Sequence, residues 1–553
     1  MQMSGAQILI ESLISEGVQT VFGYPGGQAL NIFDEFYKAA DRIKVVLTAH
    51  EQGAAHAADG YARTSGRPGV CVATSGPGAT NLVTGIANAY LDSVPIVALT
   101  GNVGTPLLGR DSFQEVDIVG ITQPIVKHNF QVKDVADLEA TVHEAFQIAM
   151  SGRRGPVLID IPKDVQINRC DYRSMSPLPL PTAPTPAPEG LAAAVAAIQA
   201  SQRPFIYAGG GVLAAQAGPE LLELSQRLAA PIGLSMMGLA AIPHSYPLNL
   251  GMCGMHGRYA STVTQSEADL VIGVGVRFSD RATGNVNNYT NQCKVIHIDI
   301  DAAELGKNVC PLIELNGDAK AILTELLKLL PAAEHPEWIA RVQELEQREQ
   351  AQTALQPGFH PQNIILAVHE VFGDDMMVVT DVGQHQMWVA QTYPFEKTNT
   401  LLTSGGLGTM GYGLGAANGC SMAQGRKRTV LFTSDGSFGM NLIELATAVS
   451  QQLPLVIVLL NNGVLGMVRQ WQKRFYEEHY AQTTLDRKTD FTAVAKAFGA
   501  RGVHANTLDE LQSILHGELP TDGPILIECR IATDEQVLPM IPPGGSVKDI
   551  LLS

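Results

Sequence analysis

The sequence has 553 residues, of which 45% are hydrophobic and 16% are charged, and its formal net charge is −17 at pH 7. A chain of this length exceeds one ordinary hydrophobic core, so we expect roughly three domains of about 150 residues each. The acidic balance disfavours nucleic acid and an anionic membrane surface as main partners, but it leaves anionic small substrates open, because one site can be basic on an acidic protein.

The first residues and the cysteines bear on the compartment. The segment MQMSGAQILIESLISEGVQ lacks a basic region and carries Glu11 and Glu16 on an amphipathic pattern, so we expect the first helix here rather than a signal peptide. The seven cysteines are scattered, without a C-x-x-C pair, which argues against a disulfide framework or a structural zinc site and favours a reducing, cytoplasmic compartment. The longest apolar runs have strand length, whereas a membrane span needs about 20 apolar residues, so we expect none.

Three blocks of the chain alternate apolar strands with helices. They cover residues 1–170, with strands such as VPIVALTG; residues 191–330, with ADLVIGVGVRF and KVIHIDID; and residues 361–553, with RTVLFTSDG and LPLVIVLLNNG. Residues 171–190, with six prolines after position 175, predict an extended linker. Residues 331–360 predict a helical connector that breaks at Pro357-Gly358. Because the apolar strands alternate with helices, we predict an α/β fold of three doubly wound parallel-sheet domains.

In the first block, TAHEQGAAHAADGYAR places Glu51 directly after a predicted strand and at the start of a helix. A Glu in a first helical turn is favoured by the helix dipole, so its position alone indicates little about function.

Two neighbouring strands of the third block each end in polar side chains. TVLFTSDG delivers Asp435, and LPLVIVLLNNG delivers Asn461 and Asn462 about 27 positions further on. Ligands of parallel α/β sheets bind at the carboxyl ends of the strands. Carboxylate and amide oxygens suit Mg²⁺, which often bridges phosphates, and Val464 could add its main-chain carbonyl. The alternative is that Asp435 caps a helix and the two asparagines form a turn; the two segments together favour a metal-bound diphosphate.

The segment GGLGTMG offers a different interpretation of the same block. Gly406, Gly408 and Gly411 form a G-x-G-x-x-G pattern between the strand-like TNTLLTS and a helix, and Asp435 ends the next strand, as in dinucleotide-binding folds. However, the following helix contains more glycines, which suits close packing rather than phosphate binding. Gly436-Ser437 also looks like a helix N-terminus that can accept a phosphate itself. The sequence thus favours the metal-bound diphosphate, and a dinucleotide stays the alternative.

An Asp-Gly pair followed by Asn-Asn at this separation resembles the motif of thiamine diphosphate enzymes, although the usual Gly-Asp-Gly is Ser434-Asp435-Gly436 here. The resemblance implies that Asp435, Asn462 and the carbonyl of Val464 hold Mg²⁺. It also implies that Glu51 is the carboxyl group beside the aminopyrimidine ring, where it assists the formation of the imino tautomer.

Other parts of the cofactor site follow from the same resemblance. The carbonyl of Gly408 is expected on the aminopyrimidine, and Met410 is expected to hold the cofactor bent, although Met is more often core filler. The segment DVGQHQMW resembles a loop that grips the diphosphate. The further cofactor residues are Gly26, Pro77, Asn81, Val382, Gly383, Gln384, His385, Gly436 and Ser437.

Nearly the whole chain resembles the catalytic (large) subunits of acetolactate synthase, also called acetohydroxyacid synthase. The motifs that carry the likeness are VFGYPGG, ATSGPGATNL, DSFQEVD, SGRRGPVLIDIPKD, GMHG, GVRFSDRATG, LNNGVLGMVRQWQ and VLPMIPPGG. The resemblance implies a middle block that binds FAD without net redox in the main reaction. Its candidate residues are Arg153, Gly209, Gly210, Gly211, His256, Gly257, Arg277, Asp299 and Asp318. Ser279-Asp280 stands where the family has two aspartates, and without the resemblance GGG would be a strand-end turn and HIDID a buried strand.

The implied reaction decarboxylates pyruvate and transfers a hydroxyethyl unit to a second 2-keto acid, which is pyruvate or 2-ketobutyrate, for branched-chain amino acid biosynthesis. Arg281 is the candidate for gripping the acceptor carboxylate, with a flavin-contacting or surface arginine as the rival interpretation. Trp471 would shape the pocket for the acceptor side chain. A wide aromatic wall suits this task, because one methylene group changes the binding free energy in a hydrophobic pocket by only about 1–3 kcal/mol. The other residues implied at the active-site mouth are Phe113, Gln114, Lys163 and Met467.

In this family the blocks that carry Glu51 and Asp435 come from different subunits, so we expect a homodimer or a dimer of dimers, together with a small regulatory subunit in biosynthetic members. The main rival functions are a flavin-dependent pyruvate oxidase and a 2-keto acid decarboxylase. A glyoxylate carboligase is disfavoured because its family lacks a Glu at the position of Glu51. A nicotinamide dehydrogenase and a non-catalytic relative are the remaining alternatives.

Overall fold

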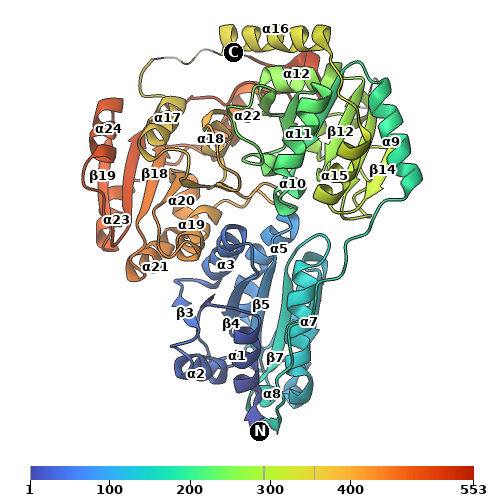
Figure 1. Cartoon of the computed structure of the whole chain (residues 1–553). Coiled ribbons are helices and arrows are strands. Elements are labelled where there is room, and N and C mark those ends of the chain that lie inside the picture. The colour runs from blue at the N-terminus through green and yellow to red at the C-terminus, as the bar shows by residue number, and fades with distance from the viewer. Residues whose placement is uncertain (1, 290–292, 354, 356, 553) are drawn as a thin grey trace.

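The computed structural model describes residues 2–289, 293–353, 355 and 357–552. They form three units, each built on a parallel six-stranded sheet with helices packed on its faces (Figure 1). The first unit (blue) lies at the bottom of Figure 1, the middle unit (green to yellow) at the upper right, and the third unit (orange to red) at the upper left. The predicted α/β fold of three doubly wound sheets is confirmed.

The first unit has the strand order β3-β2-β4-β5-β7-β6. Its strands are β2 (Thr20–Gly23), β3 (Lys44–Leu47), β4 (Gly69–Ala73), β5 (Ile96–Asn102), β6 (His128–Gln131) and β7 (Val157–Pro162). Its helices are α1 (Gly5–Ser15), α2 (Leu30–Lys38), α3 (Glu51–Ser65), α4 (Pro77–Asn81), α5 (Val83–Asp92), α6 (Ile118–Thr122), α7 (Leu138–Met150) and α8 (Lys163–Ile167). An antiparallel pair, β1 (Gln2–Ser4) and β8 (Arg169–Asp171), joins the two ends of this unit.

The middle unit has the strand order β11-β10-β9-β12-β13-β14. Its strands are β9 (Pro204–Ala208), β10 (Ile232–Leu234), β11 (Asn249–Met252), β12 (Leu270–Val274), β13 (Lys294–Asp299) and β14 (Ile313–Asn316). Its helices are α9 (Pro188–Ala200), α10 (Gly210–Ala214), α11 (Gly218–Leu228), α12 (Tyr259–Glu267), α13 (Asp280–Thr283), α14 (Val286–Tyr289) and α15 (Ala319–Leu329).

The third unit has the strand order β16-β15-β17-β18-β20-β19. Its strands are β15 (Met377–Thr380), β16 (Leu401–Leu402), β17 (Thr429–Ser434), β18 (Leu455–Asn461), β19 (Arg501–Ala505) and β20 (Ile525–Arg530). Its helices are α17 (Pro361–Phe372), α18 (Gln384–Thr392), α19 (Tyr412–Ala423), α20 (Asp435–Asn441), α21 (Leu445–Ser450), α22 (Gly466–Phe475), α23 (Phe491–Ala497) and α24 (Leu508–His516).

The order of the strands locates the places where ligands can bind. Numbered by chain order within each unit, the first and third sheets both run 2-1-3-4-6-5, and the middle sheet runs 3-2-1-4-5-6. Ligands of such sheets sit at the carboxyl ends of the strands, at the point where the strand order reverses. These points lie between β2 and β4, between β9 and β12, and between β15 and β17.

The segments between the units differ in detail from the sequence expectation. The predicted linker ends early, because α9 already begins at Pro188, a position where helices favour proline. The predicted connector contains α16 (Pro336–Gln352), and the indole of Trp338 on this helix donates a 3.0 Å hydrogen bond to the carbonyl of Pro204. The boundaries at 170, 190, 330 and 360 stay a prediction.

Two further expectations for the ends of elements need correction. The predicted first helix begins only at Gly5, because Ser4 forms a reciprocal cap with Gln7: each backbone N–H is bonded by the other side chain. The strand-like TNTLLTS contributes only the two-residue β16. Among the described residues no helix is long and apolar enough to cross a bilayer, and all seven cysteines are free thiols.

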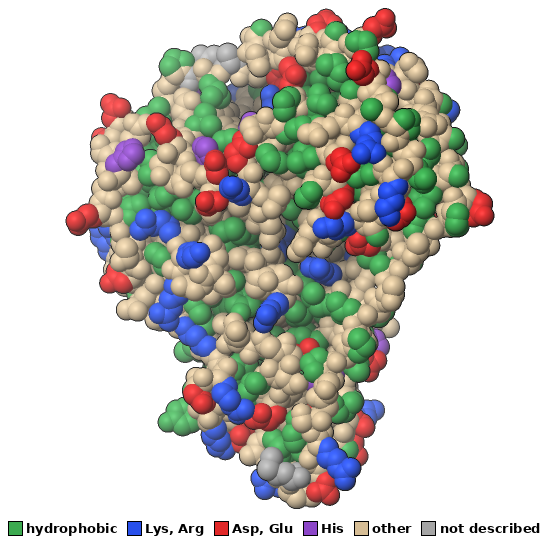
Figure 2. Space-filling view, viewed as in Figure 1, with side chains coloured by type: hydrophobic (Ala, Val, Ile, Leu, Met, Phe, Trp, Pro, Cys, Tyr) green, Lys and Arg blue, Asp and Glu red, His purple; other side chains and the backbone are tan. Residues whose placement is uncertain are grey.

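The first and third units meet along helices α3 and α19, which Figure 1 shows side by side. Their contact depends on glycine, because a Cβ at Gly60 would lie 2.2 Å from the carbonyl oxygen of Ala416, and one at Gly419 would lie 1.9 Å from that of Ala57. The glycines of α19 therefore serve close helix packing, as the sequence suggested. Acidic and basic side chains are interspersed over the face in Figure 2, so this face carries no continuous basic surface.

Candidate active site

Glu51 is the first residue of α3, at the carboxyl edge of the first sheet. The ring of His50 caps this helix by accepting a 3.1 Å hydrogen bond from the backbone N–H of Gln52. The side-chain amide of Asn81 donates a 3.0 Å hydrogen bond to Oε2 of Glu51. A Cβ at Gly78 would lie 3.3 Å from Oε1 of Glu51, so glycine leaves room for this carboxylate. The carboxylate is thus held at one oxygen, and it is half-buried.

Other predicted residues of the first unit gather at the same edge. Pro77 opens α4 at the end of β4, and the loop of Gln114 packs against Gly76, where a Cβ would lie 2.8 Å from the carbonyl oxygen of Gln114. Lys163 opens α8 at the end of β7, and its ammonium lies 3.4 Å from the carbonyl oxygen of Gly27, next to Gly26. The side chain of Phe113 is 84% exposed, so within one chain it faces solvent.

Asp435 lies at the carboxyl end of β17, as the first residue of α20. It is buried, and its Oδ2 accepts a 3.1 Å hydrogen bond from the backbone N–H of Gly463, which ties the tips of β17 and β18 together. Its other oxygen, Oδ1, is buried and lacks a hydrogen-bond partner among the described residues. Burial raises the pKa of Asp435 to about 6. A buried, unpaired carboxylate oxygen is costly unless a ligand satisfies it.

Asn462 lies next to Asp435, just beyond the end of β18. Its amide nitrogen donates to Oε1 of Gln384 at 3.3 Å, and its Oδ1 accepts from the backbone N–H of Val464 at 3.2 Å. These contacts orient the amide and leave the oxygen one further lone pair for a ligand. The oxygen-donor pair that the sequence predicted therefore meets at two adjacent strand ends.

The segment 382–385 follows β15 and opens helix α18. Gly383 has a φ of 149° at the N-cap, a conformation that favours glycine. Burial lowers the pKa of His385 to about 3, so its ring is neutral, and its Nε2 is buried without a described partner. The hydroxyl of Ser437 donates to the carbonyl of Val382 at 3.2 Å, which joins this segment to α20. The side chain of Gln384 is already engaged, since it donates to Gln470 and to a backbone carbonyl.

The chemistry of this donor set fits a divalent cation and a diphosphate. Asp435 and Asn462 supply the hard oxygens that Mg²⁺ requires. A helix N-terminus and a neutral imidazole supply N–H groups for phosphate oxygens. Both orphaned atoms, Oδ1 of Asp435 and Nε2 of His385, would gain partners from such ligands.

The G-x-G-x-x-G pattern does not form a dinucleotide-binding turn. The backbone N–H of Gly411, the N-cap of α19, donates a 2.8 Å hydrogen bond to Oδ1 of Asp381. Asp381 is buried, and its pKa is raised by burial. The carboxylate of Asp381 thus occupies the N-terminus of α19, where a dinucleotide phosphate would lie. Helix α3 also packs against α19.

One cleft of about 2130 Å³ runs between the units and brings together most predicted residues of the third unit with those of the middle unit. It is larger than a typical small-molecule pocket of about 300–1,000 Å³ and can hold two large ligands. From the third unit it is lined by Val382, Gly383, Gln384, His385, Gly408, Met410, Gly436, Asn462, Val464, Met467 and Trp471. From the middle unit and its border it is lined by Arg153, Gly210, Gly211, His256, Arg277, Arg281, Asp299 and Asp318.

The thiamine-site and mouth residues predicted in the first unit do not line this cleft, whereas Arg153, the flavin candidate of that unit, does. The cleft wall that the described residues form does not include Glu51, Gly26, Pro77, Asn81, Phe113, Gln114 or Lys163. One chain therefore holds two separate half-sites, at the carboxyl edges of the first and third sheets.

The flavin candidates of the middle unit lie at its strand-order reversal, between β9 and β12. Gly211 and Gly275 lie just beyond the ends of these two strands. The two backbones pack closely there, because a Cβ on Gly211 would lie 2.6 Å from Cα of Gly275. The ring of His256 is partly buried, and its Nδ1, a buried atom, lacks a partner among the described residues. Burial raises the pKa of Asp299 to about 6. A glycine turn and an unpaired imidazole nitrogen at this place fit a dinucleotide such as FAD.

Some flavin candidates have other contacts in one chain. Arg153 pairs with Glu304 at 2.7 Å, and Asp318 caps α15 by accepting from the backbone N–H of Ala321 at 3.0 Å. Gly209 and Gly257 are not part of the cleft wall that the described residues form. A Cβ on Gly257 would lie 2.5 Å from a backbone carbon of Cys253, so this glycine permits close backbone packing.

Arg281 and Trp471 meet although they come from different units. The guanidinium carbon of Arg281 lies 5.7 Å from the centre of the Trp471 ring, and the Arg281 side chain is 64% exposed. The Trp471 ring also packs edge-on against Phe475, with ring centres 5.8 Å apart. An exposed cation above an aromatic wall of the cleft can receive a carboxylate.

Sequence reasoning missed two buried carboxylates that organise the site. Asp381 holds the start of α19, and its place at the end of the strand MVVT was visible in the sequence. Glu444 accepts hydrogen bonds from the backbone N–H groups of Ala49 and His50, at 3.4 and 3.0 Å, and so holds the turn before Glu51. No sequence pattern links positions 444 and 50, so only the fold shows this contact.

Comparison with known proteins covers all three units. Residues 3–121 match the N-terminal TPP binding domain of thiamine pyrophosphate (thiamine diphosphate) enzymes, residues 191–326 match their central domain, and residues 381–529 match their C-terminal TPP binding domain. The chain is 43% identical over 551 residues to the acetolactate synthase isozyme 2 large subunit of Escherichia coli, with 99% of each chain covered. It is 43% identical over 548 residues to the acetolactate synthase large subunit of Lactococcus lactis, covering 98% of this chain and 95% of that protein. It is 42% identical over 566 residues to the probable acetolactate synthase large subunit of Methanocaldococcus jannaschii, with 99% and 95% covered.

Proposed function

The chain belongs to the thiamine pyrophosphate enzymes, in the family of acetolactate synthase large subunits, and from this premise we propose how its residues perform the reaction. It is a thiamine diphosphate-dependent transferase that makes acetolactate for branched-chain amino acid biosynthesis. The observation that carries the residue assignments is the pair of half-sites, one at the carboxyl edge of the first sheet and one at the carboxyl edge of the third.

The third unit holds the cofactor at its diphosphate end. Asp435, Asn462 and the carbonyl of Val464 would bind Mg²⁺, and the 382–385 segment with Gly436 and Ser437 would bind the phosphate oxygens. When bound, the cofactor accepts the electrons that are released as CO₂ leaves pyruvate. The chain's own task is to fix the cofactor and to exclude water and stray protons from it.

Glu51 handles the proton at the other end of the cofactor. Its carboxyl group would hold a proton beside the aminopyrimidine ring, with Gly26, Pro77 and Asn81 around that ring. Asn81 supports the role of Glu51, because its 3.0 Å hydrogen bond fixes one carboxylate oxygen and leaves the other free to face the ring.

The acceptor 2-keto acid would bind between the middle and third units. Arg281 would grip its carboxylate, while Trp471 and Met467 would shape the space for a methyl or ethyl group, so that pyruvate and 2-ketobutyrate are both acceptors. Phe113, Gln114 and Lys163 would close this space from the first unit. Their assignment requires the first unit of another chain, because they lie outside the cleft of their own chain.

We propose FAD as a second cofactor in the middle unit, near Gly209, Gly210, Gly211, His256, Gly257, Arg153, Arg277, Asp299 and Asp318. The strand order 3-2-1-4-5-6 and the glycine turn at its reversal support this proposal. The cleft is also large enough for both cofactors.

The separation of the half-sites supports an assembly of at least two chains, in which Glu51 of one chain faces the Asp435–Asn462 edge of the other. The relatives are named large subunits, which implies a small subunit as a further partner of this chain.

The product distribution tests the function. The purified protein is incubated with pyruvate, thiamine diphosphate, Mg²⁺ and FAD, and the products are quantified. We expect acetolactate as the main product. Acetaldehyde as the main product would identify a decarboxylase instead, and acetate with peroxide would identify a pyruvate oxidase.

A further inference from the structure

The cofactor loop, residues 404–411 between β16 and α19, carries both Gly408 and Met410. The four residues in its middle, 405–408, are exposed in the single chain, and Gly405, Gly406 and Gly408 line the cleft. Three of these four are glycines, which lose much conformational freedom when they are ordered. A loop of this composition needs external contacts to hold one shape.

The third unit itself holds only the ends of the cofactor loop. The side-chain amide of Gln386 donates a 3.0 Å hydrogen bond to the carbonyl of Ser404, and Asp381 accepts from Gly411 at the other end. Among the described residues, the hydrogen bonds to the middle of the loop come from the first unit of the same chain.

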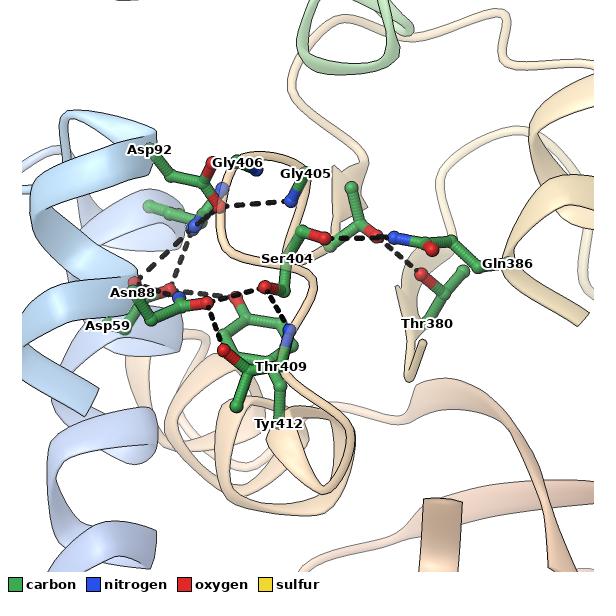
Figure 3. Close-up of polar contacts among 12 residues, drawn as sticks. Asp59, Asn88, Asp92, Thr380, Gln386, Ser404, Gly405, Gly406, Thr409 and Tyr412 are labelled. Atoms are coloured by element: carbon green, nitrogen blue, oxygen red, sulfur yellow. Dashed lines mark hydrogen bonds and ion pairs between the residues drawn. The ribbon is translucent and has the colours of Figure 1, made fainter. Parts of the chain in front are cut away.

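Asn88 on α5 joins the two sides of the loop (Figure 3). Its side-chain oxygen accepts a 2.5 Å hydrogen bond from the hydroxyl of Ser404 and a 3.1 Å hydrogen bond from the hydroxyl of Thr409. The hydroxyl of Ser404 also accepts from the backbone N–H of Thr409 at 2.9 Å. One buried amide therefore fixes the distance between the residues that flank the glycines.

Asp92, one helical turn further along α5, holds the glycines themselves. Its two carboxylate oxygens accept from the backbone N–H groups of Gly405, at 3.1 Å, and Gly406, at 2.6 Å. These hydrogen bonds are charge-assisted, and the Asp92 side chain that accepts them is fully buried. Figure 3 shows Asp92 lying directly against this turn.

A buried ion pair fixes the two α5 side chains in turn. Arg63 on α3 pairs with Asp92 at 2.9 Å and with Asp59 at 2.7 Å. Asp59 also accepts from the amide of Asn88 at 3.2 Å and from the hydroxyl of Tyr412 at 2.7 Å. Both acceptors of this network that reach the loop, Oδ1 of Asn88 and the carboxylate of Asp92, are thus pre-oriented by helices α3 and α5, which limits the entropy lost when the cofactor binds.

We propose that Asn88 and Asp92 are positioning residues, which hold the cofactor loop in the shape that presents Gly408 and Met410 to thiamine diphosphate. The inference rests on the proposed roles of those two residues. It also gives the first unit two tasks in the dimer: Glu51 acts on the cofactor bound to the other chain, and Asn88 and Asp92 order the loop of their own chain.

The test measures the affinity of the holoenzyme for thiamine diphosphate by titration at saturating Mg²⁺, with kcat at saturating cofactor as a second readout. Asn88→Ala and Asp92→Ala release the loop, so the binding-competent shape is populated only part of the time. We expect the apparent dissociation constant to rise roughly tenfold or more, with a smaller loss of kcat. Asp92→Asn keeps one acceptor oxygen and should give an intermediate value.

Tyr412→Phe is the matched control. It removes a buried hydrogen bond of the same network, but none that reaches the cofactor loop. We expect its cofactor affinity to stay within about twofold of the wild type. If Tyr412→Phe weakens binding as much as Asn88→Ala does, the effect belongs to the interface in general and the proposal is wrong.

Ser404→Ala covers the case that Asn88→Ala does not fold, because it removes the same hydrogen bond from the loop side. Where Asn88→Ala does fold, the double variant should lose less affinity than the two single losses combined, because both changes break the Ser404–Asn88 bond. Unchanged affinity in Ser404→Ala would overturn the proposal. Failure of the wild type to bind thiamine diphosphate would instead overturn the proposed function.

Discussion

The backbone N–H of Gly463 donates a 3.1 Å hydrogen bond to Oδ2 of Asp435. This contact brings the ends of β17 and β18 together and leaves Oδ1 of Asp435 buried without a described partner. The third sheet thus offers one unsatisfied carboxylate oxygen beside the amide of Asn462, an arrangement that a divalent cation would stabilise.

Removing this carboxylate should abolish metal-dependent cofactor binding. We expect Asp435→Ala to weaken thiamine diphosphate binding at saturating Mg²⁺ by roughly 30-fold or more, because the loss of a buried charged ligand costs about 2–5 kcal/mol of binding free energy. Isothermal titration calorimetry measures this change. Asp522→Asn, on an exposed loop, is the control and should bind like the wild type. Normal binding by Asp435→Ala would refute the metal assignment.

Glu51→Gln should separate catalysis from binding. The amide keeps the shape of the side chain and can still accept from Asn81, but it cannot hold or release the proton. We expect kcat to fall by roughly 10²–10⁴-fold, while cofactor affinity changes little. Exchange of the cofactor C2 proton, followed by NMR, should slow in parallel. A variant that keeps most of its activity would show that Glu51 is not the proton carrier.

Trp471→Leu should change the choice of acceptor. The smaller side chain removes the aromatic wall under Arg281, so the difference between a methyl and an ethyl acceptor should shrink. We expect the ratio of acetohydroxybutyrate to acetolactate, measured with both keto acids in competition, to fall by roughly 10- to 100-fold. Lys473→Arg, on the same helix but outside the cleft wall that the described residues form, is the control. An unchanged ratio in Trp471→Leu would remove this role.

Asp299 should make the stability of the flavin-free protein depend on pH. Its folded pKa of about 6 exceeds the ordinary value of about 3.9, so the folded state binds the proton more tightly than the unfolded state. Wild-type stability should therefore fall as the pH rises from about 4 to about 6 and stay lower above that range. Asp299→Asn has no buried carboxylate to ionise, so its Tm should exceed that of the wild type above pH 6. This difference in Tm should shrink towards pH 4. A difference in Tm that grows as the pH falls would contradict this assignment.

The sequence predicted the residues that lie at strand ends, because a strand, a turn and a helix follow one another locally in the chain. The places of Asp435, Asn462 and Glu51 at strand ends were predicted in this way, whereas the role of Glu51 was inferred from the family resemblance. The sequence also favoured close packing for the glycines of α19, and the contacts of Gly419 agree with that interpretation. The strand orders were not predicted, because they depend on which strands pair and not on what each strand contains.

The contacts between units could not be predicted from the sequence for the same reason. Glu444 holds the turn before Glu51, and Asn88 holds Ser404, across more than 300 residues of intervening chain. Each of these side chains is unremarkable in its own segment. Their roles arise only when the first and third units pack together along α3 and α19.

We expect each active site to combine Glu51 of one chain with Asp435 of another. The decisive experiment mixes the inactive Glu51→Gln and Asp435→Ala proteins and verifies the exchange of subunits by differential tags. Mixed dimers contain one site with both residues intact, so about a quarter of the wild-type acetolactate activity should return. Verified mixed dimers that stay as inactive as either parent would show that the site does not form between chains.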